Sequence, residues 1–191
     1  YVSKKKLLIG DAHFPFVSEY ALVRIYEIAE KLQPEIIIQM GDLYDMYAHS
    51  KFPRSLNTYS PEEEENLGVE GARAMWKRLR EICPKAECFQ IWGNHDIRPM
   101  KRTAEAQPSV EHIVAKHVKS IMSFEGVTLV EDPRQELIIG DCQHIHGYRS
   151  QLGSHRDFAL MNTWTGHSHK GGVVYRRFKA QTFWEANAGF I

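Results

Sequence analysis

Carboxylate, amide and imidazole side chains occur in five short clusters along the chain, and the first three directly follow predicted buried strands. The clusters are Asp11-Ala12-His13, Gly41-Asp42-Leu43-Tyr44-Asp45, Gly93-Asn94-His95-Asp96, His146-Gly147 and Gly166-His167-Ser168-His169. Oxygen and nitrogen donors of these kinds suit borderline divalent ions such as Mn, Fe or Zn, rather than Ca or a thiolate-bound metal. The residue types therefore predict a metal site.

The positions of the clusters favour one shared site. In open α/β sheets ligands bind beyond the carboxyl ends of the strands, so the three clusters in the first half should converge. His167 and His169 are separated by one residue, so in an extended segment both side chains would point to the same side. A single Gly-Asp or Gly-His pair is more often a turn than a ligand. The five clusters together, in this order, are a far more specific signal.

The first half of the chain has the pattern of alternating strands and helices. Apolar runs at 6–9 and 35–40 flank a segment with helical spacing, which has Ser18 as its N-cap and Pro34 just past its end. Ser60-Pro61-Glu62-Glu63 is a capping box that begins a second helix, ending before Pro84. Acidic residues at 62–65 are explained by this helix N-terminus and are assigned no function. A third strand is expected at 86–92.

The second half is dominated by strand-like runs. They lie at 127–130, 136–139, 142–146, 173–178 and 182–186, and a helix is expected after Ser109. Alternation followed by strand runs predicts an α/β fold in which a mostly parallel sheet packs on a more antiparallel one, with helices outside.

Length and composition favour an ordinary globular protein. The 191 residues fit one domain, 1–191. The absence of an initiator Met and the end at Ile191 suggest trimming at both ends. Basic and acidic residues number 24 each, so the net charge gives no global signal for DNA, RNA or an anionic membrane and leaves a local basic patch open. The apolar run near the N-terminus is too short for a signal peptide or a membrane span, and Cys83, Cys88 and Cys142 fit reduced thiols. We therefore expect a cytoplasmic protein without membrane association.

In these five clusters the chain resembles the calcineurin-like metallophosphoesterases. Their ordered signature is D-x-H, G-D-x-x-D, G-N-H-D/E, H and G-H-x-H. The resemblance extends from residue 7 to about 189, includes Asn187-Ala188-Gly189 at the last strand end, and is greatest for compact bacterial and phage members, which have Pro-Phe after D-x-H as in His13-Phe14-Pro15-Phe16. It implies a four-layer α/β/β/α sandwich, with two mixed sheets flanked by helices.

The resemblance also implies roles for individual residues. It assigns one metal to Asp11, His13, Asp42 and His169 and a second to Asp42, Asn94, His146 and His167. The two divalent ions, Mn first and otherwise Fe, Zn, Ni or Co, would hold a bridging hydroxide that attacks phosphorus. His95 would be the general acid, with Asp45 fixing its tautomer. For Asp96 a structural role in tying down its loop is favoured over catalysis.

The substrate is less well defined, and no substrate-binding residue is assigned. Protein phosphatases of the superfamily have Arg after G-D-x-x-D, whereas this chain has Met46. The leading hypothesis is a phosphodiesterase acting on nucleotides or nucleic acid. A phosphomonoesterase or protein phosphatase is the alternative, and a non-catalytic scaffold that binds metal is a third reading. A dinucleotide-binding fold is set aside because the first strand lacks G-x-G-x-x-G.

Several further residues could contact substrate. Arg98 or Arg149 could replace the missing phosphate-binding arginine, although a solvated surface position is the simpler reading for both. His144 shares a strand face with His146. Tyr44 and Tyr47 could stack on a base or could belong to the core.

Overall fold

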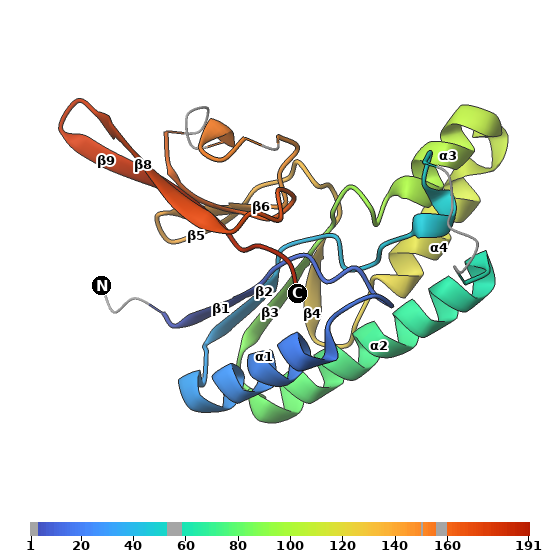
Figure 1. Ribbon diagram of the computed structural model, residues 1–191, viewed down its shortest axis with the longest axis horizontal. Helices are drawn as coiled ribbons and strands as arrows, with labels where there is room; N and C mark the ends of the chain where they lie inside the picture. Colours follow the sequence, from blue (N-terminus) through green and yellow to red (C-terminus); the bar gives the residue numbers. More distant parts are fainter. Residues whose placement is uncertain (1–3, 53–58, 150, 156–159) are drawn as a thin grey trace.

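Two β-sheets pack against each other, and helices cover the far side of the first sheet (Figure 1). The computed structural model describes residues 4–52, 59–149, 151–155 and 160–191. None of the helices in this described part has both the length and the apolar character needed to cross a membrane.

The first sheet is parallel throughout. Its order is β1-β2-β3-β4, formed by β1 (Lys6–Ile9), β2 (Ile36–Gln39), β3 (Glu87–Ile91) and β4 (Val127–Val130). Ile37 packs into the helix-side core, whereas Ile36 and Ile38 pack toward the second sheet. Because both faces of the sheet are covered, its strands are nearly continuous apolar runs.

The second sheet is mixed, with order β5-β6-β7-β9-β8. Its strands are β5 (Leu137–Ile139), β6 (Cys142–Ile145), β7 (Asn162–Thr165), β8 (Gly172–Phe178) and β9 (Gln181–Asn187). β6, β7 and β9 run parallel, while β5 and β8 are antiparallel to their neighbours. In Figure 1 the β8–β9 hairpin extends away from the rest of the molecule.

The helices begin and end where local sequence signals place them. They are α1 (Glu19–Leu32), α2 (Pro61–Ile82), α3 (Arg98–Ala106) and α4 (Glu111–Ile121), with short 3-10 turns η1 (Tyr47–His49) and η2 (Pro108–Val110). Ser18 caps α1 through the amide of Ala21, and Ser60 and Glu63 form the predicted capping box of α2. Both caps satisfy amides that have no partner within the helix.

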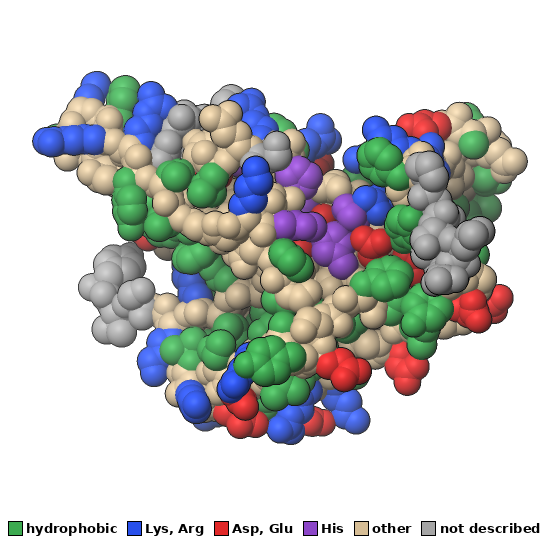
Figure 2. Space-filling model, viewed as in Figure 1, with side chains coloured by type: hydrophobic (Ala, Val, Ile, Leu, Met, Phe, Trp, Pro, Cys, Tyr) green, Lys and Arg blue, Asp and Glu red, His purple; other side chains and the backbone are tan. Residues whose placement is uncertain are grey.

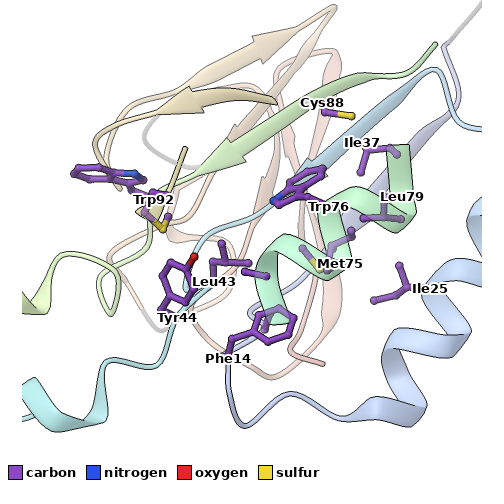
Figure 3. Close-up of a cluster of buried hydrophobic side chains, with 14 of the residues drawn as sticks. Phe14, Ile25, Ile37, Leu43, Tyr44, Met75, Trp76, Leu79, Cys88 and Trp92 are labelled. Atoms are coloured by element: carbon purple, nitrogen blue, oxygen red, sulfur yellow. The ribbon is translucent and has the colours of Figure 1, made fainter. Parts of the chain in front are cut away.

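The larger apolar core lies between the parallel sheet and the helices. Figure 3 shows Trp76, Met75 and Leu79 of α2 pointing toward strand residues such as Ile37. The Trp76 indole donates to Gln90 Oε1 at 3.1 Å, so its polar atom is satisfied inside the core. A smaller cluster, which includes Ile91 and Val130, joins the two sheets. The two cores hold the carboxyl ends of β1 to β3 in fixed positions.

The predicted fold class is confirmed: the protein is α/β, with two sheets flanked by helices. One difference is that the first sheet is purely parallel, whereas both were expected to be mixed. The helices α1 to α4, which lie entirely within the described residues, belong to the half containing the parallel sheet. On the side of the mixed sheet the described residues include a helical turn at 154–155. The sequence patterns also did not predict α3 or β7.

Candidate metal centre

The predicted ligands meet beyond the carboxyl ends of the strands. Asp11, Asp42 and Asn94 follow β1, β2 and β3, whereas His146 follows β6 and the pair His167 and His169 follows β7. Histidine side chains accordingly gather near the centre of the face shown in Figure 2, between the two halves of the molecule. The convergence expected from strand order is therefore present.

One cluster brings together Asp11, His13, Asp42 and His169, whose ligand atoms all lie within 4.8 Å of one another. The Nε2 atoms of His13 and His169 are 3.1 Å apart, and His169 Nε2 lies 3.0 Å from Asp11 Oδ2. Two imidazole nitrogens pointing at one position beside a carboxylate form a typical arrangement for holding a borderline cation.

A second cluster brings together Asp42, His146 and His167. His146 Nδ1 donates to the carbonyl oxygen of Met40 at 2.9 Å, so its Nε2 is the ring atom that faces Asp42 Oδ2, at 3.3 Å. Asn94 Oδ1 lies 3.0 Å from the same Nε2. A backbone carbonyl that fixes the tautomer of a histidine is a common partner of metal-binding imidazole.

Asp42 belongs to both clusters and is 1% exposed, while Asp11 is 0% exposed. Although burial opposes its ionisation, His146 and His95 hold the pKa of Asp42 below its usual range. The pKa of His146 is raised in turn: burial lowers it, but the charges of Asp42 and Asp11 prevail. Buried carboxylates need cationic partners, and divalent ions would replace the proton on the imidazole. The residues present therefore fit two metal ions that share Asp42.

Four of the predicted ligands have strained backbones. Positive φ angles occur at His13 (50°), Asp42 (51°), His167 (67°) and His169 (57°). For residues other than glycine this conformation costs about 1–2 kcal/mol, and such strain concentrates at functional sites. His167 and His169 thus lie in a turn, so the expectation of an extended segment was wrong. His167 nevertheless belongs to the cluster with Asp42 and His146, and His169 belongs to the cluster with Asp11 and His13.

Glycines at two strand ends allow the loops to pass close to the ligands. A Cβ on Gly93 would overlap the backbone and carboxylate of Asp42, and one on Gly41 would overlap the ring of His146. Gly41 also has a φ of +99°. Gly41 and Gly93 are therefore required by packing, and Gly41 is required by turn geometry as well.

Asp45 orients two histidines at once. Its Oδ1 accepts from His13 Nδ1 at 2.9 Å and from His95 Nδ1 at 3.0 Å. Burial opposes ionisation of Asp45, but these two hydrogen bonds keep its pKa below the usual range. Pairing of Asp45 with His95 was predicted, whereas its contact with His13 was not.

Arg98, at the start of α3, reaches the same region. Its Nη1 donates to the carbonyl oxygen of Asp45 at 2.8 Å, and its Nη2 lies 2.6 Å from His95 Nε2. His95 Nδ1 is a donor here, so Nε2 accepts from the guanidinium. Arg98 is therefore a residue of the site, rather than a solvated surface arginine.

Two buried carboxylates outside the clusters, Asp96 and Glu64, accept hydrogen bonds from backbone amides of the loops that follow β2 and β3. Asp96, fully buried, accepts from the amides of Gly93 (2.7 Å) and Tyr44 (2.8 Å), which is the structural role expected for it. Burial, with the nearby charge of Asp42, raises the pKa of Asp96. Glu64 accepts from the amides of Tyr47 and Ala48, a role that the acidic run gave no sign of.

Asn187, at the end of β9, holds the turn that carries the last two histidines. Its side chain donates to the carbonyl oxygen of Gly166 and to Thr165 Oγ1. Gly189 then accepts from the amide of Asp11 at 3.2 Å. This segment connects the mixed sheet to the first metal cluster.

Other residues considered from the sequence lie outside the three Asp/His groups. His144 is fully buried and its Nδ1 donates to Leu137, so it packs within the mixed sheet and cannot contact substrate. Tyr44 is a core residue whose hydroxyl donates to Ile121. Arg149 lies over the Tyr148 ring, at 5.5 Å.

No protein-family model matches the chain. It is 22% identical over 183 residues to the Gene 54 protein of Mycobacterium phage L5, which covers 90% of this chain and 71% of that protein. Among solved structures it is similar to the phosphoesterase Yfce from E. coli, with 19% identity, a TM-score of 0.43 and coverage of 97% of this chain and 79% of the other. It is also similar to the Pseudomonas putida nuclease MPE, with 18% identity, a TM-score of 0.45 and coverage of 98% and 75%.

The chain resembles a calcineurin-like metallophosphoesterase. Its two-sheet α/β fold and the Asp/His clusters implied by the sequence motifs are both present.

Proposed function

We propose that this protein is a metal-dependent phosphoesterase that hydrolyses phosphodiesters, with nucleotides or nucleic acid as the substrate class. The observation that carries the proposal is the pair of Asp/His clusters sharing the buried carboxylate of Asp42. Two cations a few ångströms apart suit an in-line displacement at phosphorus, because together they stabilise the attacking and the leaving oxygen.

The proposed ligands are Asp11, His13, Asp42 and His169 for one ion and Asp42, Asn94, His146 and His167 for the other. Mixed nitrogen and oxygen donors favour Mn, with Fe, Zn, Ni and Co as alternatives. When bound, the two ions would activate a water molecule and neutralise the phosphoryl oxygens.

His95 is proposed to protonate the leaving oxygen. Asp45 fixes its ring, because Oδ1 and the carbonyl oxygen of Asp45 lie 3.0 Å and 3.1 Å from His95 Nδ1. His95 Nε2 is then the atom that would hold the transferred proton. Arg98 now donates to that nitrogen, and a phosphate oxygen would compete for the guanidinium, which would release Nε2.

A diester is favoured over a phosphoprotein. Met46 is buried and occupies the position at which protein phosphatases have a phosphate-binding arginine. Arg98 supplies a guanidinium from another element instead, beside the proposed acid. Cytoplasmic residence belongs to the same proposal, since Cys83, Cys88 and Cys142 are buried thiols without a disulfide.

The test measures Mn²⁺-dependent hydrolysis of bis-p-nitrophenyl phosphate and of p-nitrophenyl phosphate. Wild type should hydrolyse the diester, while Asp42→Ala should be inactive and His95→Ala should lose about 10²-fold or more. Asp141→Ala, at an exposed aspartate, is the matched control. Wild type that hydrolyses neither ester would refute the proposal and favour the non-catalytic scaffold. Preference for the monoester would favour the phosphomonoesterase alternative.

A further inference from the structure

A basic hollow adjoins the proposed metal centre on the side of α3. Its volume is about 330 Å³, and its lining includes Lys51, Phe52, Arg98, Lys101 and Arg102 together with the proposed ligand Asn94. We call it the α3 groove. Because Asn94 and Arg98 belong to both the groove and the centre, a chain that enters one extends into the other.

Positive charge is concentrated in the α3 groove. Four cationic side chains line it against one carboxylate, Glu105, which lies 3.6 Å from Arg102. Basic and acidic residues balance over the whole sequence, so this local excess is not a consequence of composition. Figure 2 shows Lys and Arg side chains beside the central histidines, on the side of α3 and α4. Such a patch attracts phosphates.

An exposed aromatic ring lies in the same groove. Phe52 is 64% exposed, and the Lys51 ammonium lies 5.7 Å from its ring centroid. Proteins that bind single-stranded nucleic acid combine cations that follow the backbone with aromatic rings on which bases stack. A duplex would present stacked, paired bases that cannot lie on Phe52.

Arg98 connects the two regions. Its guanidinium is within hydrogen-bonding distance of His95 Nε2 and of the Asp45 carbonyl oxygen, whereas Lys51 and Lys101 are exposed and line the groove. A phosphate between the metals could therefore contact Arg98, while neighbouring phosphates contact the lysines.

We infer that the α3 groove binds single-stranded nucleic acid, with Arg98 at the scissile phosphate and Lys51, Lys101 and Arg102 at adjoining phosphates. This inference rests on the proposed function and narrows its substrate to an oligonucleotide. In this arrangement, the base whose phosphate contacts Lys51 stacks on the ring of Phe52.

Binding is tested by fluorescence anisotropy of a labelled oligo(dT)12 in Ca²⁺, over a range of salt concentrations. Lys51→Ala/Lys101→Ala should weaken binding about tenfold and reduce the salt slope by about 1.4, because each phosphate contact on a single strand contributes about 0.7. Phe52→Leu should weaken binding about fivefold or more, through loss of stacking. Lys77→Ala/Lys85→Ala, which removes two exposed lysines of α2 and of the turn before β3, is the matched control and should leave binding unchanged.

Hydrolysis supplies a second reading that separates this inference from the proposed function. For Lys51→Ala/Lys101→Ala, the ratio of oligonucleotide to bis-p-nitrophenyl phosphate turnover should fall about tenfold. Equal binding and an equal salt slope in wild type and this variant would overturn the proposal that the α3 groove binds nucleic acid. Tighter binding of a blunt 12-base-pair duplex would overturn the assignment to a single strand. If wild type has no activity on either substrate, the proposed function fails, and the anisotropy series still decides whether the groove binds the oligonucleotide.

Discussion

The half of the chain with the parallel sheet and the half with the mixed sheet contribute to the centre in different ways. The first supplies Asp11, Asp42 and Asn94 from strands covered on both faces, and both carboxylates are almost completely buried. The second supplies imidazoles that range from fully buried His146 to His169, whose side chain is 39% exposed.

This difference shows how the centre is constructed. Buried carboxylates carry the negative charge that makes a cation necessary. His13 joins them from the same half, while His146, His167 and His169 complete the clusters from the other sheet. Asp42 and His146 come from different sheets and are 3.3 Å apart, so the centre exists only when the sheets are packed together. Substitutions in the first half should therefore have larger effects than those in the exposed part of the second.

The largest effect is expected for Asp42→Asn, which keeps the shape of the side chain and removes its charge. Both proposed ions lose a ligand, and hydrolysis of bis-p-nitrophenyl phosphate should fall about 10⁴-fold or more. Metal analysis of the dialysed protein should show loss of both Mn²⁺ ions. Exposed Asp141→Asn is the matched control. Two ions retained by Asp42→Asn would contradict the shared ligand.

The second prediction compares two histidines of the mixed-sheet half. His146→Ala leaves Asp42 without its buried partner, which should lower the free energy of unfolding by about 3 kcal/mol in EDTA. His169→Ala should change it by less than about 0.5 kcal/mol, because that side chain is partly exposed. Urea unfolding measures both values. Similar losses in the two variants would show that burial does not distinguish these ligands.

The third prediction concerns the packing that holds Asp42. Gly93→Ala places a Cβ against the backbone and carboxylate of Asp42, so Mn²⁺ affinity measured by calorimetry should fall about 10- to 100-fold. Gly140→Ala is the control: it has a φ of +68° but open space around it, so it should lose about 1 kcal/mol of stability through the backbone alone. Unchanged Mn²⁺ affinity in Gly93→Ala would contradict this prediction, because it would mean that the loop moves to accommodate the added Cβ without displacing Asp42.

The strands β1 to β3 and the polar clusters could be predicted from the sequence because both depend on local patterns. Apolar runs at β1 to β3 and the capping box at Ser60 require no knowledge of tertiary contacts. The carboxyl ends of parallel strands necessarily meet, so the convergence of the clusters followed from the topology.

Features that depend on tertiary contacts could not be predicted. α3 is 9 residues long and only its Pro99 is buried, so it has few apolar residues that would reveal a helix, and no local pattern connects Arg98 at its start to the site. His169 has a left-handed backbone, whereas its spacing from His167 fits an extended segment equally well. The two histidines on Asp45 are 82 residues apart, at positions 13 and 95, a pairing that no local pattern reveals.

The smallest effect on activity is expected for His144→Leu, in the mixed sheet next to the centre. Burial lowers the pKa of His144 to about 4, with help from the charge of Lys6, compared with 6.5 in an unfolded chain. The unfolded state therefore binds a proton more readily than the folded state. The contribution of His144 to the free energy of unfolding is fully present above pH 6.5 and is lost as the pH falls toward 4.

Because leucine does not titrate, the decrease in the free energy of unfolding between pH 7 and pH 5 should be about 1–2 kcal/mol smaller in His144→Leu than in wild type. Diester hydrolysis at pH 7 should stay within about twofold, since His144 contacts Leu137 and not the clusters. Urea unfolding at both pH values and kcat/KM on bis-p-nitrophenyl phosphate check the two expectations. A large loss of activity with wild-type stability would return His144 to the substrate site and weaken the contrast between the buried sheet and the centre.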